Sequence, residues 1–130
     1  MSTIFSNILS GDIPAFKVAE NDSFLAFLDI NPLSKGHVLV IPKNETDYIF
    51  DIEKDEYEAF WSFAKMVAKG IKEVFPCNKI GVSVVGLEVA HAHIHLIPIN
   101  SVADMNFSKE KLSLSNEELS AIAENIKSAI

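Results

Sequence analysis

The segment 91–98, with the sequence HAHIHLIP, carries three of the chain's four histidines at a spacing of two residues. Side chains alternate between the two faces of a strand, so a strand here places His91, His93 and His95 on one face and the apolar residues between them on the other. Successive imidazoles would stand about 7 Å apart. The segment therefore predicts a strand with one face in the core and a row of imidazoles on the other.

Such a row of imidazoles is compatible with three roles: a structural role, metal binding and nucleophilic catalysis. A purely structural row is disfavoured, because histidine is neither a preferred core residue nor a strong strand former. A zinc site could combine His91, His93 or His95 with the fourth histidine, His37, at about 2.0 to 2.1 Å from the metal. In nucleophilic catalysis, one neutral imidazole attacks phosphorus or a carbonyl carbon while its neighbours orient it and manage protons.

Length and charge limit the classes of protein that are open. The 130 residues predict one domain, 1–130, large enough for its own core. A net charge of -7 argues against broad nucleic-acid binding, although a pocket for one small nucleotide remains possible. No apolar run approaches the roughly 20 residues of a membrane span, and no secretion signal is apparent. The lone Cys77 fits a reducing cytoplasm.

The hydrophobic patterns predict an α+β domain built on a five-stranded antiparallel sheet. A short helix should precede Gly11, a long one should run from about 54 to 75 before Pro76, and a last one should follow the capping-box pattern at Ser115 and reach about 128. The expected strands are 17–20, 24–28, 37–41, 79–85 and the histidine segment. We expect a long helix to cover one sheet face and the C-terminal helix to pack on the body or across a dimer.

Several motifs in this order resemble the histidine-triad (HIT) superfamily, in particular its Hint-like branch of nucleotidyl hydrolases and transferases. They are HAHIHLIP at 91–98, FLAFLDINP at 24–32, GHVLVIPK at 36–43, TIF at 3–5 and GDIPA at 11–15. The resemblance covers about 3–99 and fades over a C-terminal extension, about 100–130. It implies a HIT-like fold and a homodimer in which two sheets join into one.

The resemblance also implies a nucleoside site on the first helix and the second strand. Asp29 would accept hydrogen bonds from the ribose hydroxyls, and Ile30 would lie against the base. The apolar residues implied to wall or adjoin this site are Ile4, Phe5, Ile8, Phe27 and Leu28. Plainer roles are core packing for the first helix and a turn-capping side chain for Asp29.

For catalysis, the resemblance implies displacement at the α-phosphorus of a purine nucleotide, either a nucleoside phosphoramidate or an adenylylated amine. His93 would attack and form a nucleotidyl-imidazole, and water would then release the nucleoside monophosphate, AMP for an adenosine substrate. A backbone carbonyl at or near His91 would hold the second nitrogen of His93, His95 would contact the phosphate or the leaving group, and His37 would lie beside the triad. We expect no cofactor, because neither a P-loop pattern nor a carboxylate cluster for magnesium is present. Alternatives are a dinucleoside polyphosphate hydrolase, a strand-borne zinc hydrolase and a non-catalytic nucleotide-binding module.

The chain departs from the family pattern just before the histidine segment. Leu87 and Glu88 stand where relatives have Gln and a Ser or Thr that helps hold the phosphate, and Ser83 is the nearest polar candidate in place of an upstream Asn. Glu88 either faces a cationic or amine leaving group or points to solvent, leaving the backbone of Leu87 to Val89 to touch the ligand.

A second departure concerns a metal site. Many family members have a Cys-x-x-Cys pair that helps to hold a structural zinc, and the matching residues here are Thr3 and Ser6. We therefore expect no metal.

Overall fold

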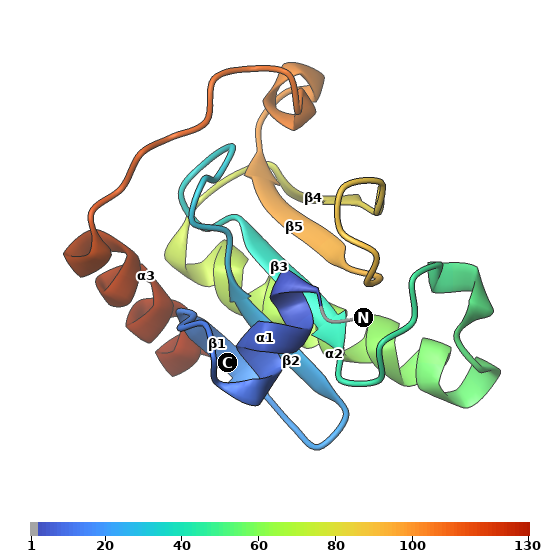
Figure 1. Ribbon diagram of the computed structural model, residues 1–130. Helices are drawn as coiled ribbons and strands as arrows, with labels where there is room; N and C mark the ends of the chain where they lie inside the picture. The colour runs from blue at the N-terminus through green and yellow to red at the C-terminus, as the bar shows by residue number, and fades with distance from the viewer. Residues whose placement is uncertain (1–2) are drawn as a thin grey trace.

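The protein, described over residues 3–130 in a computed structural model, is built on one five-stranded sheet in which all neighbouring strands are antiparallel (Figure 1). The strands are β1 (Lys17–Glu20), β2 (Phe24–Leu28), β3 (Val38–Pro42), β4 (Lys79–Ser83) and β5 (Ile94–Ile99). Their spatial order is β1-β2-β3-β5-β4, so β1 and β4 form the edges. The predicted α+β class with a five-stranded antiparallel sheet is confirmed.

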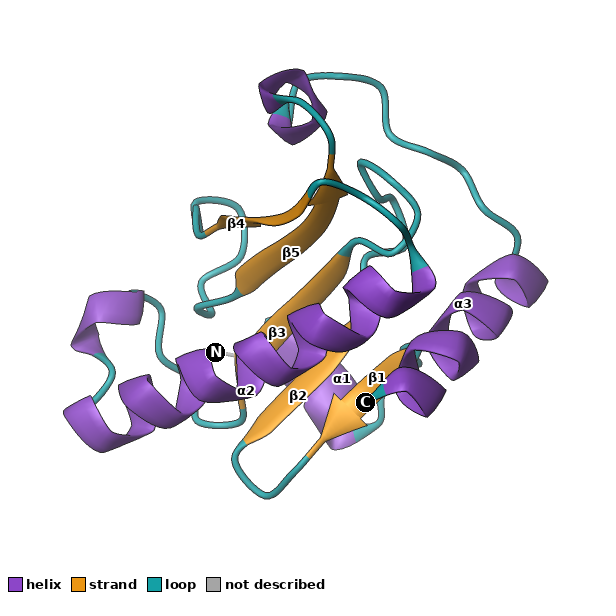
Figure 2. Ribbon diagram, turned by 180° about the vertical axis from the view of Figure 1, so that it is seen from behind, coloured by secondary structure: helices purple, strands orange, loops and turns teal. Residues whose placement is uncertain are grey.

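The helices cover both faces of this sheet. α2 (Lys54–Val74) and α3 (Asn116–Ala129) lie on one face and α1 (Ile4–Ser10) on the other, as Figure 2 shows from behind. All three helices were predicted from sequence, whereas the 3-10 turns η1 (Ile49–Asp51) and η2 (Val102–Met105) were not, because one turn has no hydrophobic period to detect. Within residues 3–130, no helix combines the length and the apolarity needed to cross a bilayer.

Alternation along the strands divides the core in two. Ala26 and Leu28 of β2 face α2 and α3, whereas Leu25 and Phe27 face α1. Because both faces of the central strands are covered, all five residues of β2 are buried. The smaller cluster under α1 continues into the segment that carries the histidines, which brings Phe5 to within 4.9 Å of the His93 ring centroid.

The histidine strand is shorter than expected. β5 begins at Ile94, so His91 and His93 precede it, because the Ala92 N–H donates to the Thr46 carbonyl at 2.7 Å and leaves the sheet ladder. Ala92 and Ile94 still lie in the core beneath α2. The alternation predicted for this segment therefore survives, although the expected spacing of about 7 Å does not, since the ring centroids of His93 and His95 are 5.0 Å apart.

Candidate active site

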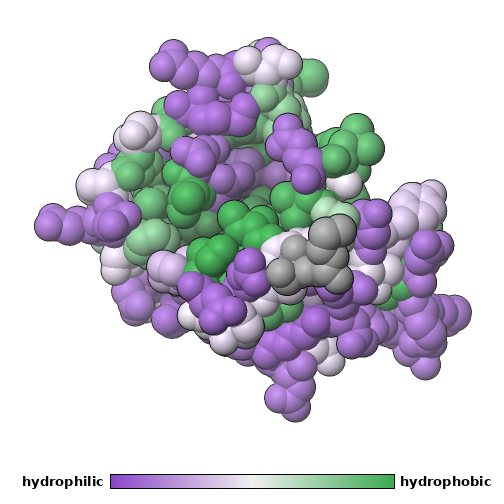
Figure 3. All heavy atoms as spheres, in the orientation of Figure 1, coloured by the Kyte–Doolittle hydropathy of each residue, from purple (hydrophilic) through white to green (hydrophobic). Residues whose placement is uncertain are grey.

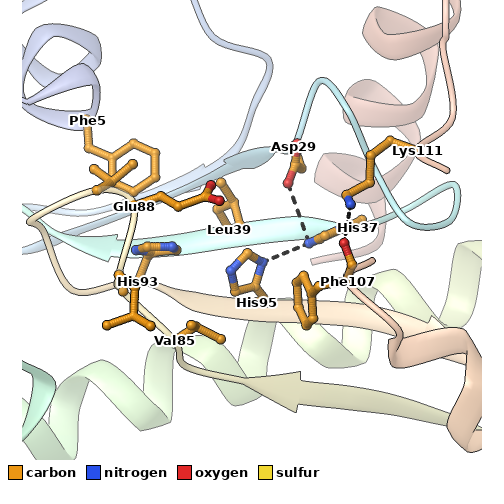
Figure 4. Close-up of a pocket in the computed structure, with 13 residues that line it drawn as sticks. Phe5, Asp29, His37, Leu39, Val85, Glu88, His93, His95, Phe107 and Lys111 are labelled. Atoms are coloured by element: carbon orange, nitrogen blue, oxygen red, sulfur yellow. Dashed lines mark hydrogen bonds and ion pairs between the residues drawn. The ribbon is translucent and has the colours of Figure 1, made fainter. Parts of the chain in front are cut away.

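A cavity of about 400 Å³ opens on the α1 side of the sheet, where β3 and β5 meet the connector that precedes the histidine segment. In Figure 3, apolar side chains gather around the centre of this face and hydrophilic ones along its rim. The residues that line the cavity are Phe5, Asp29, His37, Leu39, Val85, Gly86, Leu87, Glu88, Val89, His93, His95, Phe107 and Lys111 (Figure 4). Its volume is within the range of small-molecule sites.

His93 presents an unprotonated nitrogen to this cavity. Its Nδ1 lies 2.8 Å from the His91 carbonyl oxygen, which can only accept, so Nδ1 carries the proton and Nε2 keeps its lone pair. Burial lowers the pKa of His93, against an opposing contribution from that hydrogen bond. The imidazole is therefore neutral near pH 7, as a nucleophile requires.

His95 has the opposite tautomer, and His37 is the reason. The Leu33 N–H donates to His37 Nδ1 at 3.0 Å, so the neutral His37 ring carries its proton on Nε2. That Nε2 is 2.9 Å from His95 Nδ1, which must accept, and His95 therefore carries its own proton on Nε2. Burial, followed by the neighbouring His95, lowers the pKa of His37 to about 3, and burial with His93 lowers the pKa of His95 to about 4.

His91 is buried outside the cavity. Its Nε2 donates to the Pro42 carbonyl at 2.8 Å, and its Nδ1 has no hydrogen-bond partner within residues 3–130. The three histidines of the segment are thus not equivalent, because His91 fixes the backbone carbonyl that orients His93, while His93 and His95 face the cavity.

Asp29 follows β2 and has two environments. Its Oδ1 accepts from the Asn31 N–H at 2.9 Å, which is the turn-capping arrangement, and its Oδ2 lies 3.7 Å from His37 Nε2. Burial raises the pKa of its carboxyl, while the Asn31 bond and the positive charge of Lys111 oppose the rise. The side chain caps the turn and lines the cavity at the same time.

The other residues implied for the nucleotide site are scattered. Three of them, Phe5, Glu88 and Val89, line the cavity, and Ile8 and Phe27 pack behind Phe5. Ile4 and Ile30 are exposed. Leu28 lies on the opposite face of the sheet, and Ser83 pairs with His95 across β4 and β5. In Figure 4 the Glu88 carboxylate is turned toward Leu39, on the same side of the two imidazoles as Asp29. The side chain is also exposed to solvent.

Sequence reasoning missed two lining residues from the C-terminal extension, Phe107 and Lys111. The Phe107 ring lies edge-on to His95, with centroids 5.0 Å apart. Both residues sit in an irregular segment without periodicity, so no pattern pointed to them. Leu39, whose strand position opposite His95 is fixed by alternation, could have been found by pairing β3 with β5.

Two groups of residues bear on metal binding. Thr3 and Ser6 form a capping box at the start of α1, in which the Thr3 N–H donates to Ser6 Oγ at 2.6 Å and the Ser6 N–H to Thr3 Oγ1 at 3.1 Å. Asp29, His37 and His95 each offer a ligand atom within 4.8 Å of the others. A metal on His37 Nε2 would have to displace the proton that this nitrogen donates to His95, because His37 Nδ1 already accepts from Leu33.

The fold and the cavity define a small α+β protein with a histidine-lined cavity. The chain belongs to the HIT family, because the HIT domain model matches residues 10–102. A Schizosaccharomyces pombe protein named adenosine 5′-monophosphoramidase is 36% identical over 132 residues, covering 100% of this chain and 99% of that protein.

Solved structures agree with this assignment. A Hit-like protein of Bartonella henselae superposes with a TM-score of 0.85 at 28% identity, over 99% of this chain and 97% of that one. A histidine triad family protein of Mycobacterium smegmatis, described as zinc-bound, gives a TM-score of 0.80 at 26% identity, over 99% and 93% of the two chains.

Proposed function

We propose that the protein is a HIT-type nucleotide hydrolase that cleaves the phosphoramidate bond of a purine nucleoside phosphoramidate or adenylylated amine. The observation that carries this proposal is the pair of complementary tautomers facing one cavity, a lone pair on His93 Nε2 beside an N–H on His95 Nε2. Similarity to a protein named adenosine 5′-monophosphoramidase supports the substrate class.

In the first step, His93 Nε2 attacks the α-phosphorus, a phosphorus–nitrogen bond to His93 forms and the bond to the leaving amine breaks. His95 donates a hydrogen bond from Nε2 to the departing nitrogen or a phosphate oxygen, and the amine takes up a proton from water. In the second step, a water molecule attacks the phosphorus, releases a proton and frees His93. The products are the amine and the nucleoside monophosphate.

The test compares wild type with His93→Gly on adenosine 5′-phosphoramidate, with and without chelator. We expect wild type to release AMP in the presence of chelator and to show an adduct of one AMP by intact-mass spectrometry after a rapid quench without acid. His93→Gly should release none while still unfolding cooperatively above the assay temperature. Turnover by the glycine variant would refute His93 as the nucleophile.

The zinc alternative has one observation in its favour, the cluster of Asp29, His37 and His95. The hydrogen bonds of His37 argue against it, because they commit both ring nitrogens. Loss of activity with chelator and recovery with zinc would favour the metal over the covalent route. Nucleotide affinity without turnover of any substrate would instead favour the binding module.

We also propose that the protein forms a homodimer through β4. This edge strand and the connector after it expose apolar side chains, with Val82 49%, Val85 53% and Leu87 89% accessible. An uncovered apolar edge strand is a template for pairing with another chain. Pairing of β4 with its copy would give the continuous sheet that the family resemblance implies, and light scattering on the purified protein measures the resulting mass. The free Cys77 suits the cytoplasmic location expected from sequence.

A further inference from the structure

We propose that Lys111, supplied by the C-terminal extension, is a specificity-determining residue that binds an anionic group, a carboxylate or a phosphate, on the leaving group. The inference rests on the proposed function and refines its substrate class. Lys111 lies outside the segment 10–102 that matches the HIT domain model.

The structure attaches this part of the extension to the site. The Leu112 N–H donates to the Pro32 carbonyl at 2.9 Å, which ties the extension to the loop that follows Asp29. Phe107 contacts the His95 ring edge-on. These two contacts hold Phe107 and Lys111 against the mouth of the cavity.

Four aromatic rings follow one another along the cavity, and those of His95 and Phe107 separate Lys111 from His93. Phe5 closes the end beside His93, and the rings of His93, His95 and Phe107 follow at successive centroid distances of 5.0 Å, with Lys111 at the far end (Figure 4). In displacement at phosphorus, the nucleophile and the leaving group lie roughly in line on opposite sides. A leaving group that departs on the His95 side would therefore meet Phe107 and Lys111, at the end of the cavity that Asp29 also lines.

Charge makes Lys111 the natural partner of an anion at that end. Among the described residues that line the cavity, Lys111 is the only lysine or arginine, whereas Asp29 and Glu88 are carboxylic acids. The whole chain carries a net charge of -7. Without Lys111, an anionic leaving group would meet only negative charge.

The ammonium group of Lys111 is held in place and still has capacity to bind. Its Nζ donates to the carbonyls of Phe107 and Lys109, the latter at 3.3 Å, and an ammonium has three N–H donors, so one remains for a ligand. Its charge reaches into the site, because it lowers the pKa of His37 and opposes the rise in the pKa of Asp29. A cationic leaving group, such as a lysine-like diamine, is disfavoured for the same reason.

The experiment uses adenosine 5′-phosphoramidates of three amines of similar length. β-Alanine carries a carboxylate, its methyl ester is neutral, and O-phosphoethanolamine carries a phosphate. Lys111→Met removes the charge but keeps most of the side chain, and Lys109→Met is the matched control, because Lys109 lies on the same segment but does not line the cavity. The readout is the ratio of kcat/KM for each anionic compound to kcat/KM for the ester.

We expect wild type to favour the anionic compounds, and Lys111→Met to reduce the ratio about tenfold, equivalent to about 1.4 kcal/mol. Because each rate is divided by the ester rate, a general effect of Lys111→Met on catalysis cancels in the ratio, and Lys109→Met should keep the wild-type ratio. Whether the carboxylate or the phosphate shows the larger change identifies the preferred anion. A ratio unchanged in Lys111→Met, or lowered equally in Lys109→Met, would overturn the proposal.

A failure of the proposed function can be told apart from a failure of this inference. If wild type hydrolyses neither these three compounds nor adenosine 5′-phosphoramidate, the hydrolase proposal is wrong. Titration calorimetry on the His93→Gly protein then compares binding of the carboxylate and ester compounds with and without Lys111→Met. Tighter binding of the carboxylate compound that disappears with Lys111→Met supports the anion site, and equal binding refutes it.

Discussion

His37 makes one hydrogen bond to the Leu33 N–H and one to His95, and two substitutions can test the two bonds separately. His37→Asn places Oδ1 near the original Nδ1, so it can still accept from the Leu33 N–H but cannot reach His95. His37→Gln places its amide N–H2 near the original Nε2, so it can donate to His95 but leaves the Leu33 N–H without an acceptor. Both variants lose the same buried ring, so their difference reports the two hydrogen bonds.

The magnitudes follow from these contacts. A buried N–H left unpaired costs about 1 to 3 kcal/mol, so the Gln variant should be less stable than the Asn variant by about that amount. The neutral bond from His37 to His95 is worth about 0.5 to 1.5 kcal/mol, and its loss frees the His95 tautomer. The Asn variant should therefore have kcat/KM on adenosine 5′-phosphoramidate about 2- to 10-fold below the Gln variant.

Urea unfolding followed by circular dichroism gives the two stabilities, and initial rates at pH 7 give kcat/KM. His37→Phe keeps a ring but removes both hydrogen bonds, so it gives the stability and the kcat/KM expected when both bonds are lost. The reasoning fails if stability and activity fall in parallel in the Asn and Gln variants, because the two bonds would then not act separately.

Three further predictions concern the pH dependence of activity, the pH dependence of stability, and the loop before β3. Burial lowers the pKa values of His93 and His95, that of His95 to about 4, so the acid limb of kcat/KM should lie below pH 6.5; an acid limb centred at 6.5 or above would contradict this. The same lowered values mean that the unfolded chain binds more protons, so the free energy of unfolding should decrease as the pH falls from about 6.5 toward 4. Gly36→Ala should lower it by about 1 to 3 kcal/mol in urea unfolding, because the residue has φ of +93° and a Cβ would lie 2.7 Å from the Phe75 ring; an unchanged midpoint would contradict that strain.

The sequence predicted the sheet and the three α-helices well, because each has a strong pattern. α2 shows apolar residues at helical spacing between acidic residues and Pro76, and α3 has its cap at Ser115, whose Oγ accepts from the Glu118 N–H. The start of β5 was predicted three residues too early, and the strand predicted at 79–85 ends at Ser83. The alternation of faces continues through His91 and His93, although the hydrogen bonds between strands do not. The prediction rested on alternation alone and therefore placed the start of the strand too early.

The candidate site was predicted in part. Neighbouring residues of a strand face opposite sides of the sheet, so alternation alone would have placed Leu28 on the other face from Phe27 and Asp29. Leu28 indeed packs on the face that α2 and α3 cover, away from the cavity. Lys111 and Phe107 could not have been predicted in this way. They reach the cavity only because the chain crosses from η2 to α3 along the loop after Asp29, which is a long-range contact without a local pattern.

The proton positions in this site are set by the main chain. The Leu33 N–H, the Pro42 carbonyl and the His91 carbonyl each bind one histidine nitrogen, and a backbone group can only donate or only accept. The tautomer of His93 therefore depends on where the backbone runs, and that of His95 depends on it through the His37 ring. Gly36, immediately before His37, has no functional group, but it allows the backbone conformation that places the His37 ring. It therefore contributes to the proton positions in the site.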